Sequence, residues 1–217
     1  MSPPPLVLAC DLGGSSFRAA LIDAHGASVA EAAVPLEASV DAQGRSQTDP
    51  GRWWQALLDC VGALSARPGA LLARVAGVAI CGFTRTQVFL DRAGAPVHDA
   101  LLWNDTRAEA QAQRLRERLA AAGEDASAVN AFHPLARLLW LHAHAPAAAA
   151  RLHGMLEPKD YLNLRLCGAW ASDRVSMAPA TRLLAQLERL APDASFALPP
   201  VPLPALHAPV ACIGRVD

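Results

Sequence analysis

The stretch that decides the fold is Asp11-Leu12-Gly13-Gly14-Ser15-Ser16-Phe17-Arg18. It lies between two apolar runs, residues 6–10 and 17–22, so it predicts two strands joined by a tight glycine turn. Glycines let a backbone approach a phosphate closely, and exposed N–H groups and hydroxyls can donate hydrogen bonds to it. An aspartate at the end of the first strand can hold a magnesium ion. The stretch is therefore either a purely structural glycine-turn hairpin or a phosphate-binding one, and Arg18 on the second strand favours phosphate binding.

Strands and helices are expected in a mixed order on the C-terminal side of this hairpin. Asp49 is expected to cap a helix that starts at Pro50 and carries Trp53 and Trp54 on its apolar face. Strands first, then alternating helix and strand, indicate an α/β or α+β domain with a mixed β-sheet, of which we expect the α/β form with helices flanking the sheet. Further strands are expected at residues 28–35, 74–81 and 87–90, and further helices at 106–122, 134–144, 147–152, 161–167 and 183–190.

Composition and charge exclude several classes of partner. The 217 residues fit one large domain or two small ones, and 19 basic against 20 acidic residues give no attraction to nucleic acid or to an anionic membrane. The most apolar long stretch, residues 133–150, carries Arg137 and histidines, so no membrane span is expected. Five scattered cysteines without a CxxC pair predict free, mostly buried thiols and a cytoplasmic protein.

A second polar segment, Leu101-Leu102-Trp103-Asn104-Asp105-Thr106-Arg107-Ala108, follows an apolar run. Sugars are bound by amides and carboxylates that contact vicinal hydroxyls beside an aromatic face, which is what Trp103, Asn104 and Asp105 offer. The alternative is that Trp103 is a core residue and that Asn104 and Asp105 cap the following helix. Because Thr106 can also cap that helix, both interpretations can hold together.

The order and spacing of four segments resemble the FGGY family of carbohydrate kinases. The hairpin alone also resembles the hexokinase and ROK families, but ROK kinases carry a cysteine-rich zinc motif, which is absent here. The resemblance covers residues 6–214 and implies the ribonuclease H-like fold of the actin, sugar kinase and Hsp70 superfamily. The four segments are Gln47-Thr48-Asp49-Pro50 with Trp53-Trp54, the stretch around Trp103, Pro158-Lys159-Asp160-Tyr161, and Ala171-Ser172-Asp173.

The resemblance also implies roles for individual residues at a nucleotide site. Asp11 is expected to position Mg²⁺. Arg18 is expected either to face the γ-phosphate of ATP or to brace the hairpin through an ion pair. The residues implied in binding the ATP phosphates are Gly13, Gly14, Ser15, Ser16 and Arg18.

A sugar site is implied in the middle of the chain. Thr84 and Arg85 occupy two positions where both the xylulokinase-like and the glycerol-kinase-like patterns have other residues, so the resemblance leaves the substrate open. An arginine here could pair with an acid group on the substrate or with Asp105. The implied sugar-binding residues are Thr84, Arg85, Trp103, Asn104, Asp105, Phe132 and His133.

The activity implied is ATP-dependent phosphorylation of a sugar hydroxyl, on a ketopentose or related polyol. Residues 1–217 would be the N-terminal, sugar-binding domain, and the proline-rich residues 192–209 an extended segment. The catalytic base and the C-terminal ATP-binding domain are expected beyond Asp217, so the isolated chain is expected to be inactive. An apolar face is expected where that domain docks, and this face would allow a homodimer.

Two other functions remain open. The chain could be a non-catalytic sugar-binding or regulatory module of the same fold, which would lack a glycine-rich Asp motif further along its gene. It could also be a ROK- or hexokinase-like kinase that uses Asp105 as its base. The absence of a zinc motif and the presence of the FGGY segments argue against this last function.

Overall fold

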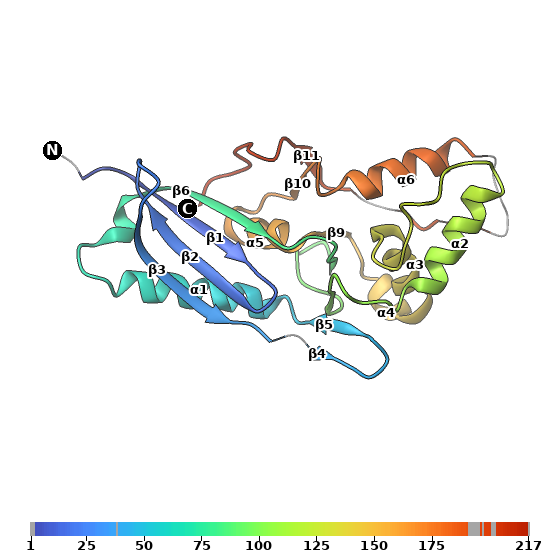
Figure 1. Cartoon of the computed structure of the whole chain (residues 1–217), viewed down its shortest axis with the longest axis horizontal. Helices are drawn as coiled ribbons and strands as arrows, with labels where there is room; N and C mark the ends of the chain where they lie inside the picture. The colour runs from blue at the N-terminus through green and yellow to red at the C-terminus, as the bar shows by residue number, and fades with distance from the viewer. Residues whose placement is uncertain (1–2, 38, 191–195, 197, 201–202, 217) are drawn as a thin grey trace. The chain divides into compact units, whose positions relative to one another are not determined.

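The computed structural model describes residues 3–37, 39–190, 196, 198–200 and 203–216 (Figure 1). The chain divides into two compact units. The first unit comprises Met1–Ala38 and Asp49–Phe83, and the second comprises Ser39–Thr48 and Thr84–Asp217.

The first unit is built on a four-stranded sheet in the order β3-β2-β1-β6 (Figure 1). Strands β1 (Leu6–Leu12), β2 (Ser16–Ile22) and β3 (Ser28–Pro35) form an antiparallel meander, and β6 (Val75–Gly82) lies parallel to β1. The predicted hairpin, the predicted strand at residues 28–35 and the predicted mixed sheet are all confirmed.

Alternation along β1 separates the two faces of this sheet. Leu8, Cys10 and Leu12 are buried, whereas Val7 and Asp11 between them are exposed, as the two-residue period of a strand requires. Helix α1 (Gly51–Ser65) packs against β2 and β3 and buries its own apolar stripe in the same core. Asp11 therefore stands on the face of the sheet opposite the buried leucines.

Helix α1 begins one residue later than predicted. Pro50 holds the cap position, and the carboxylate of Asp49 accepts a hydrogen bond from Gly51 N at 2.8 Å. Asp49 thus satisfies one of the free N–H groups of the first turn, as a capping aspartate does. A short 3₁₀ helix, η1 (Leu71–Arg74), connects α1 to β6.

The second unit has several very short strands, in three small sheets. Among these strands only β7 had a counterpart in the predictions, the strand at residues 87–90, because runs of two or three residues are too short to show a period. The strands are β4 (Ser39–Val40), β5 (Ser46–Thr48), β7 (Val88–Leu90), β8 (Ala100–Leu101), β9 (Gly154–Leu156), β10 (Ala171–Asp173) and β11 (Ala205–His207).

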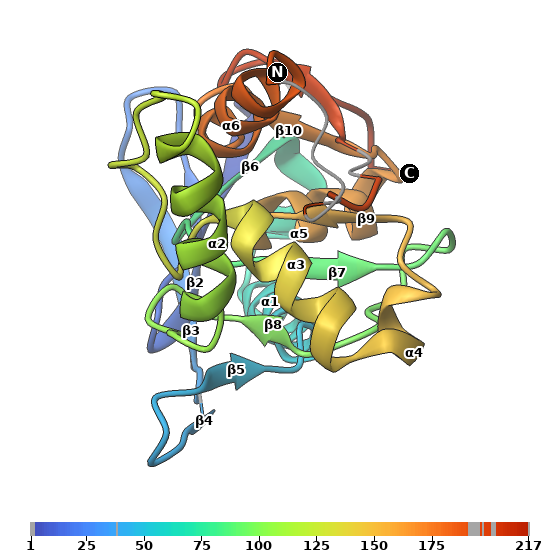
Figure 2. The ribbon, with the colours of Figure 1, turned by 90° about the vertical axis from the view of Figure 1, so that its right-hand side faces the viewer.

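Helices pack together to form the apolar core of the second unit (Figure 2). Leu115 and Leu119 meet Leu135 and Leu139 there, and Leu183 joins the same cluster. Pro134 and Pro158 stand in the first turns of their helices, where a missing N–H costs nothing. The helices are α2 (Glu109–Ala120), α3 (Pro134–His144), α4 (Pro146–Ala149), α5 (Pro158–Cys167) and α6 (Ala178–Glu188).

Three further predictions concern the ends and surfaces of the chain. Part of the proline-rich segment 192–209 lies outside the described residues, and within it Ala205–His207 forms β11, which pairs in parallel with β10. All five cysteines are free thiols, but only Cys10 and Cys60 are buried. Within the described part of the chain, no helix is long and apolar enough to cross a bilayer.

Candidate functional site

The turn of the predicted phosphate hairpin is tight and accessible. Gly13 N donates to Ser16 O at 2.9 Å, and a Cβ added to Gly13 would lie 3.1 Å from that oxygen. Around the corresponding position on Gly14 no heavy atom lies within 4 Å, and Gly14 and Ser15 are exposed. A side chain at Gly13 would therefore crowd the Ser16 carbonyl and require it to shift, while the backbone at Gly14 is open to a phosphate group.

Asp11 and Arg18 stand directly opposite each other in the β1–β2 register, and both are exposed. Cys81 on β6 donates its thiol hydrogen to Asp11 Oδ1 at 3.5 Å, so the three side chains share one face of the sheet. Among the described residues Arg18 forms no ion pair. The alternative in which Arg18 braces the hairpin through an ion pair is therefore not the observed arrangement.

Asp11 fits magnesium in one specific way. No group of three or more metal-ligating side chains gathers anywhere in the described part of the chain. Magnesium commonly takes one or two protein carboxylates, with substrate phosphates and water completing its shell. A single exposed carboxylate beside an open glycine turn suits a Mg²⁺ ion that arrives with a nucleotide.

The loop that carries Thr84 and Arg85 leads into β7 in the second unit, and both side chains are exposed. Arg85 has φ of +60°, the left-handed region that residues with a Cβ rarely adopt. Its carbonyl oxygen accepts a hydrogen bond from Arg137 Nη1 at 2.6 Å. The strained backbone of Arg85 is therefore held from inside the protein while its side chain faces solvent.

The stretch around Trp103 separates its three candidate residues. Trp103 is 54% exposed, so it is not a core residue. Asn104 keeps a buried side-chain oxygen with no hydrogen-bond partner among the described residues. Asp105 is fully buried. This loop therefore exposes an aromatic face, while it buries the Asn104 oxygen, which lacks a partner, and the Asp105 carboxylate.

Inside the protein Asp105 is held by three donors. Ser46 N lies 2.6 Å from its Oδ2, and the Arg107 guanidinium lies 2.7–2.9 Å from its two oxygens. Arg107 N donates to Oδ1 at 3.0 Å, while α2 begins only at Glu109 and has no side-chain cap. The partner of Asp105 is thus Arg107 and not Arg85, and Asp105 ties this loop to β5.

The two remaining candidates lie at the start of α3. Phe132 is half-buried, and its ring centre is 5.9 Å from Arg137 Cζ. His133 is buried; Leu135 N donates to its Nδ1 at 3.2 Å, and its Nε2 lies 3.2 Å from Pro179 O. Burial lowers the pKa of His133 to about 4. His133 is a neutral helix cap with both ring nitrogens engaged, so neither is left for a sugar hydroxyl.

Sequence reasoning missed two buried ionisable groups beside these loops, Arg137 and Glu157. Thr86 N and Gln87 Nε2 donate to the Glu157 carboxylate at 3.4 and 3.3 Å. Burial raises the pKa of Glu157 to about 8. The sequence signal for Arg137 is a single arginine in a helix that is apolar on several sides. Charged side chains are almost never fully buried without partners, so such an arginine predicts a set of buried acceptors around it.

A third polar cluster joins the segments around Lys159 and Asp173. Lys159 Nζ lies 2.6 Å from Asp160 Oδ1 and 2.7 Å from Asp173 Oδ2, and Ser172 Oγ donates to Asp160 Oδ2 at 2.5 Å. Burial alone would lower the pKa of Lys159, but the two carboxylates raise it. This cluster fixes α5 to β10 and has no candidate sugar or phosphate residue in it.

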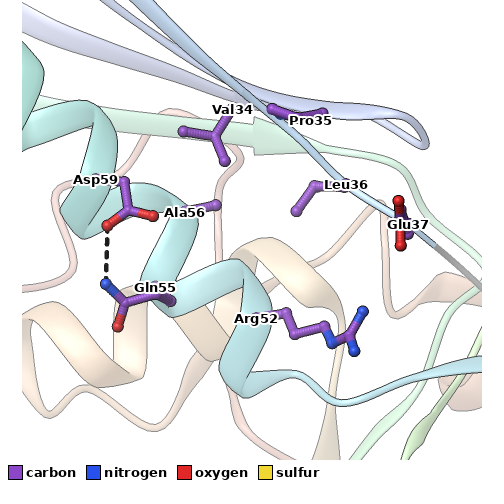
Figure 3. Close-up of a pocket in the computed structure, with 8 residues that line it drawn as sticks. All are labelled: Val34, Pro35, Leu36, Glu37, Arg52, Gln55, Ala56 and Asp59. Carbon is purple, nitrogen blue, oxygen red and sulfur yellow. Dashed lines mark hydrogen bonds between the residues drawn. The ribbon is translucent and has the colours of Figure 1, made fainter.

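The first unit also contains a shallow hollow of about 260 Å³ between the end of β3 and the first turns of α1 (Figure 3). Arg52 and Glu37 line it, and Gln55 donates to Asp59 at 2.8 Å on its wall. None of the residues predicted to bind phosphate or sugar lies in this hollow.

Comparison with known proteins identifies the family. The N-terminal domain of the FGGY family of carbohydrate kinases matches residues 6–195. The chain belongs to the FGGY family of carbohydrate kinases. The match takes in the phosphate hairpin, the Arg85 loop, the Trp103 loop and the start of α3.

Individual FGGY relatives agree with this assignment. The chain is 36% identical over 175 residues to a xylulose kinase from Streptomyces coelicolor, covering 78% of this chain and 35% of that protein. It is 34% identical over 146 residues to a glycerol kinase from Verminephrobacter eiseniae, covering 65% of this chain and 29% of that protein. The chain thus spans about a third of the length of these curated relatives.

Solved FGGY structures share the fold of the described chain. A xyloylose kinase from Brucella ovis matches with a TM-score of 0.83 and 26% identity, over 98% of this chain and 45% of that one. The xylulose kinase of Rhodospirillum rubrum matches with a TM-score of 0.81 and 24% identity, over the same shares of the two chains. The predicted sugar kinase fold is confirmed.

Proposed function

We propose that this chain is the sugar-binding part of an ATP-dependent carbohydrate kinase that phosphorylates a ketopentose or a related polyol. The observation that carries the proposal is the FGGY match over residues 6–195, with 36% identity to a xylulose kinase. A glycerol kinase among the relatives keeps polyols within the substrate class.

The phosphate hairpin is our proposed site for the nucleotide phosphates. The backbone at Gly13 and Gly14 and the hydroxyls of Ser15 and Ser16 would donate to phosphate oxygens. Asp11 would hold the Mg²⁺ that accompanies ATP, which supplies charge neutralisation during phosphoryl transfer. The exposed guanidinium of Arg18 lies on the same face and would meet the terminal phosphate.

For the sugar we propose contacts from two loops of the second unit. The exposed face of Trp103 would pack against the sugar carbons, and the unpaired oxygen of Asn104 would accept a bond from a hydroxyl. Thr84 and Arg85 offer exposed donors from the neighbouring loop. Phe132 would add an apolar wall. Asp105 and His133 would act indirectly, because their polar atoms are engaged inside the protein.

Asp105 is a poor general base in this geometry, since it is fully buried and held by Arg107 and Ser46. A base must reach the proton it removes to within hydrogen-bond distance. We therefore propose that the base belongs to a further domain, for which the greater length of the relatives leaves room.

The test is release of ADP by the full-length protein with ATP, Mg²⁺ and a panel of ketoses, aldoses and polyols. Turnover that depends on one ketopentose or polyol is the expected result. Sugar binding without turnover would point to a non-catalytic module. The absence of both sugar binding and turnover would contradict the proposal. Turnover by the isolated 217-residue chain would place the base within it.

A further inference from the structure

Arg137 on α3 is fully buried and donates hydrogen bonds to segments far from it in the sequence. Its Nη1 donates to Arg85 O at 2.6 Å, to Gln87 Oε1 at 2.7 Å and to Leu101 O at 2.9 Å. Its Nη2 donates to Leu102 O and, at 3.3 Å, to Asp105 O. One rigid guanidinium thus donates hydrogen bonds to backbone carbonyls of two loops.

The partners of Arg137 lie in the segments that carry the proposed sugar-binding residues. Arg85 belongs to the first candidate sugar loop, and Leu102 and Asp105 flank Trp103 and Asn104 in the second. The third candidate segment also meets Arg137, because the ring of Phe132 lies 5.9 Å from its Cζ. All three segments that carry proposed sugar-binding residues therefore contact the same buried side chain.

Stability alone is a weak explanation for a cation at this position. No carboxylate oxygen lies within ion-pair distance of Arg137 among the described residues, and its Nε has no partner there. Burial lowers the pKa of Arg137 to about 10, so the group is desolvated and still charged near neutral pH. A buried cation without an ion-pair partner carries its desolvation cost with no close opposite charge to offset it, so it is weak evidence for a purely stabilising role.

The strained backbone of Arg85 also indicates that Arg137 has a role beyond stability. A non-glycine residue with φ of +60° persists only where the surroundings hold it, and the bond from Arg137 to its carbonyl does so. The direction in which the Arg85 side chain leaves the loop is set by this backbone conformation. Arg137 therefore influences where that cation points without touching any ligand itself.

We propose that Arg137 is a positioning residue of the sugar site, which holds the Arg85 loop and the Trp103 loop in one fixed arrangement. This inference rests on the proposed function, because it assigns the two loops to the sugar. The five donors of a planar guanidinium suit this role, whereas an ammonium offers only three donors at a single point.

The experiment compares Arg137→Lys and Arg137→Met in the full-length enzyme, by steady-state kinetics with each substrate varied in turn. Arg137→Lys is expected to raise the sugar KM at least about tenfold and to leave the ATP KM within about twofold. Arg137→Met is expected to show a larger rise in sugar KM, which the lysine variant partly rescues. A purely structural role would lower the amount of active enzyme, and hence kcat, with the sugar KM unchanged.

Lys159→Arg is the matched control, because Lys159 is a cation of the same unit whose ion pairs are with Asp160 and Asp173, which lie outside the three segments. Its sugar KM should stay within about twofold of the parent value. An unchanged sugar KM in folded Arg137→Lys would overturn the inference, as would an equal rise in Lys159→Arg.

Two further outcomes are separated by design. If neither Arg137 variant folds, Gln87→Met tests the inference instead. This variant removes one acceptor of Arg137 and should raise the sugar KM about threefold. No rise there would also overturn the inference. If the parent enzyme turns over no sugar at all, the proposed function fails. The inference then fails because there is no sugar site to position, and this outcome is distinguished by the inactivity of the parent enzyme.

Discussion

The first unit buries apolar side chains, and the second buries charge as well. In the described part of the first unit the core consists of residues such as Leu12 and Phe17. Every buried polar or charged residue of the described chain lies in the second unit, Asp105, Arg137 and Glu157 among them. An apolar core tolerates exchanges that keep its volume, whereas a buried charge depends on particular partners. The difference indicates that the first unit is held mainly by apolar packing, whereas the structure of the second unit also depends on specific polar contacts.

The largest effect is expected from Lys159→Met in the second unit. It leaves the carboxylates of Asp160 and Asp173 buried without their cation, which typically costs about 3–5 kcal/mol of unfolding free energy. Urea unfolding followed by circular dichroism measures the loss. Arg151→Met is the control, because its 3.2 Å pair with Asp91 is exposed and should contribute less than about 1 kcal/mol. Equal losses in the two variants would break the comparison.

Leu21 tests the apolar core of the first unit in the same unfolding assay. Leu21→Ala removes a fully buried side chain from β2 and should cost about 2–5 kcal/mol. Leu21→Met keeps the volume and should cost less than about 1.5 kcal/mol. If the methionine variant were as unstable as the alanine variant, the first unit would be as specific in its contacts as the second.

Glu157 predicts a pH dependence that belongs to the second unit. Its pKa is raised from 4.5 to about 8 by burial, so the folded state keeps a proton that the unfolded state has lost. Stability from this group is therefore complete below about pH 4.5 and falls as pH rises toward 8. Above pH 6.5 the lowered pKa of His133 no longer opposes this trend, because His133 is then mostly neutral in both states.

The measurement is the melting temperature of the parent and of Glu157→Gln between about pH 6.5 and 8. The parent should lose at most about 2 kcal/mol relative to the variant across this range, since one proton changes the free energy by about 1.4 kcal/mol per pH unit. Parallel curves for the two proteins would contradict the raised pKa.

The smallest effect is expected where a left-handed backbone is released. Ala70 in the first unit and Arg85 in the second have φ of +48° and +60°. Glycine adopts this region without strain, so Ala70→Gly and Arg85→Gly should each gain up to about 1 kcal/mol in stability. Only Arg85→Gly should also raise the sugar KM. A change in sugar KM with Ala70→Gly would show that the effect is not specific to the sugar loops.

Much of the frame could be predicted from local pattern. The hairpin and β6 were expected from short apolar runs bounded by turn residues, and the predicted bounds of the third strand and of α3 were confirmed. Helix α6 begins at Ala178, five residues before its predicted start at 183, because its first turn lacks the large apolar residues that mark a helical period. The short strands β9 to β11 were missed for a similar reason.

The candidate site was predicted in its parts and not in its contacts. Trp103, Asn104 and Asp105 were predicted as sugar-site candidates, and that role stays a prediction. The pairing of Asp105 with Arg107 and the capping role of His133 were visible only in the structure. Arg137 was noted only as a charge that argues against a membrane span. Its role depends on carbonyl groups, which every residue has, so no side-chain pattern reveals them.

By itself the sequence determined the β1–β2 hairpin, the start of helix α1 and the apolar faces of both units. These features repeat within a few residues, and their periods follow from the geometry of strands and helices. Only the tertiary structure decided which polar groups are buried and what satisfies them, since Arg137 meets carbonyls 32 to 52 residues away in the chain. A buried donor must find an acceptor wherever the fold brings one, and that partner is a property of three-dimensional packing.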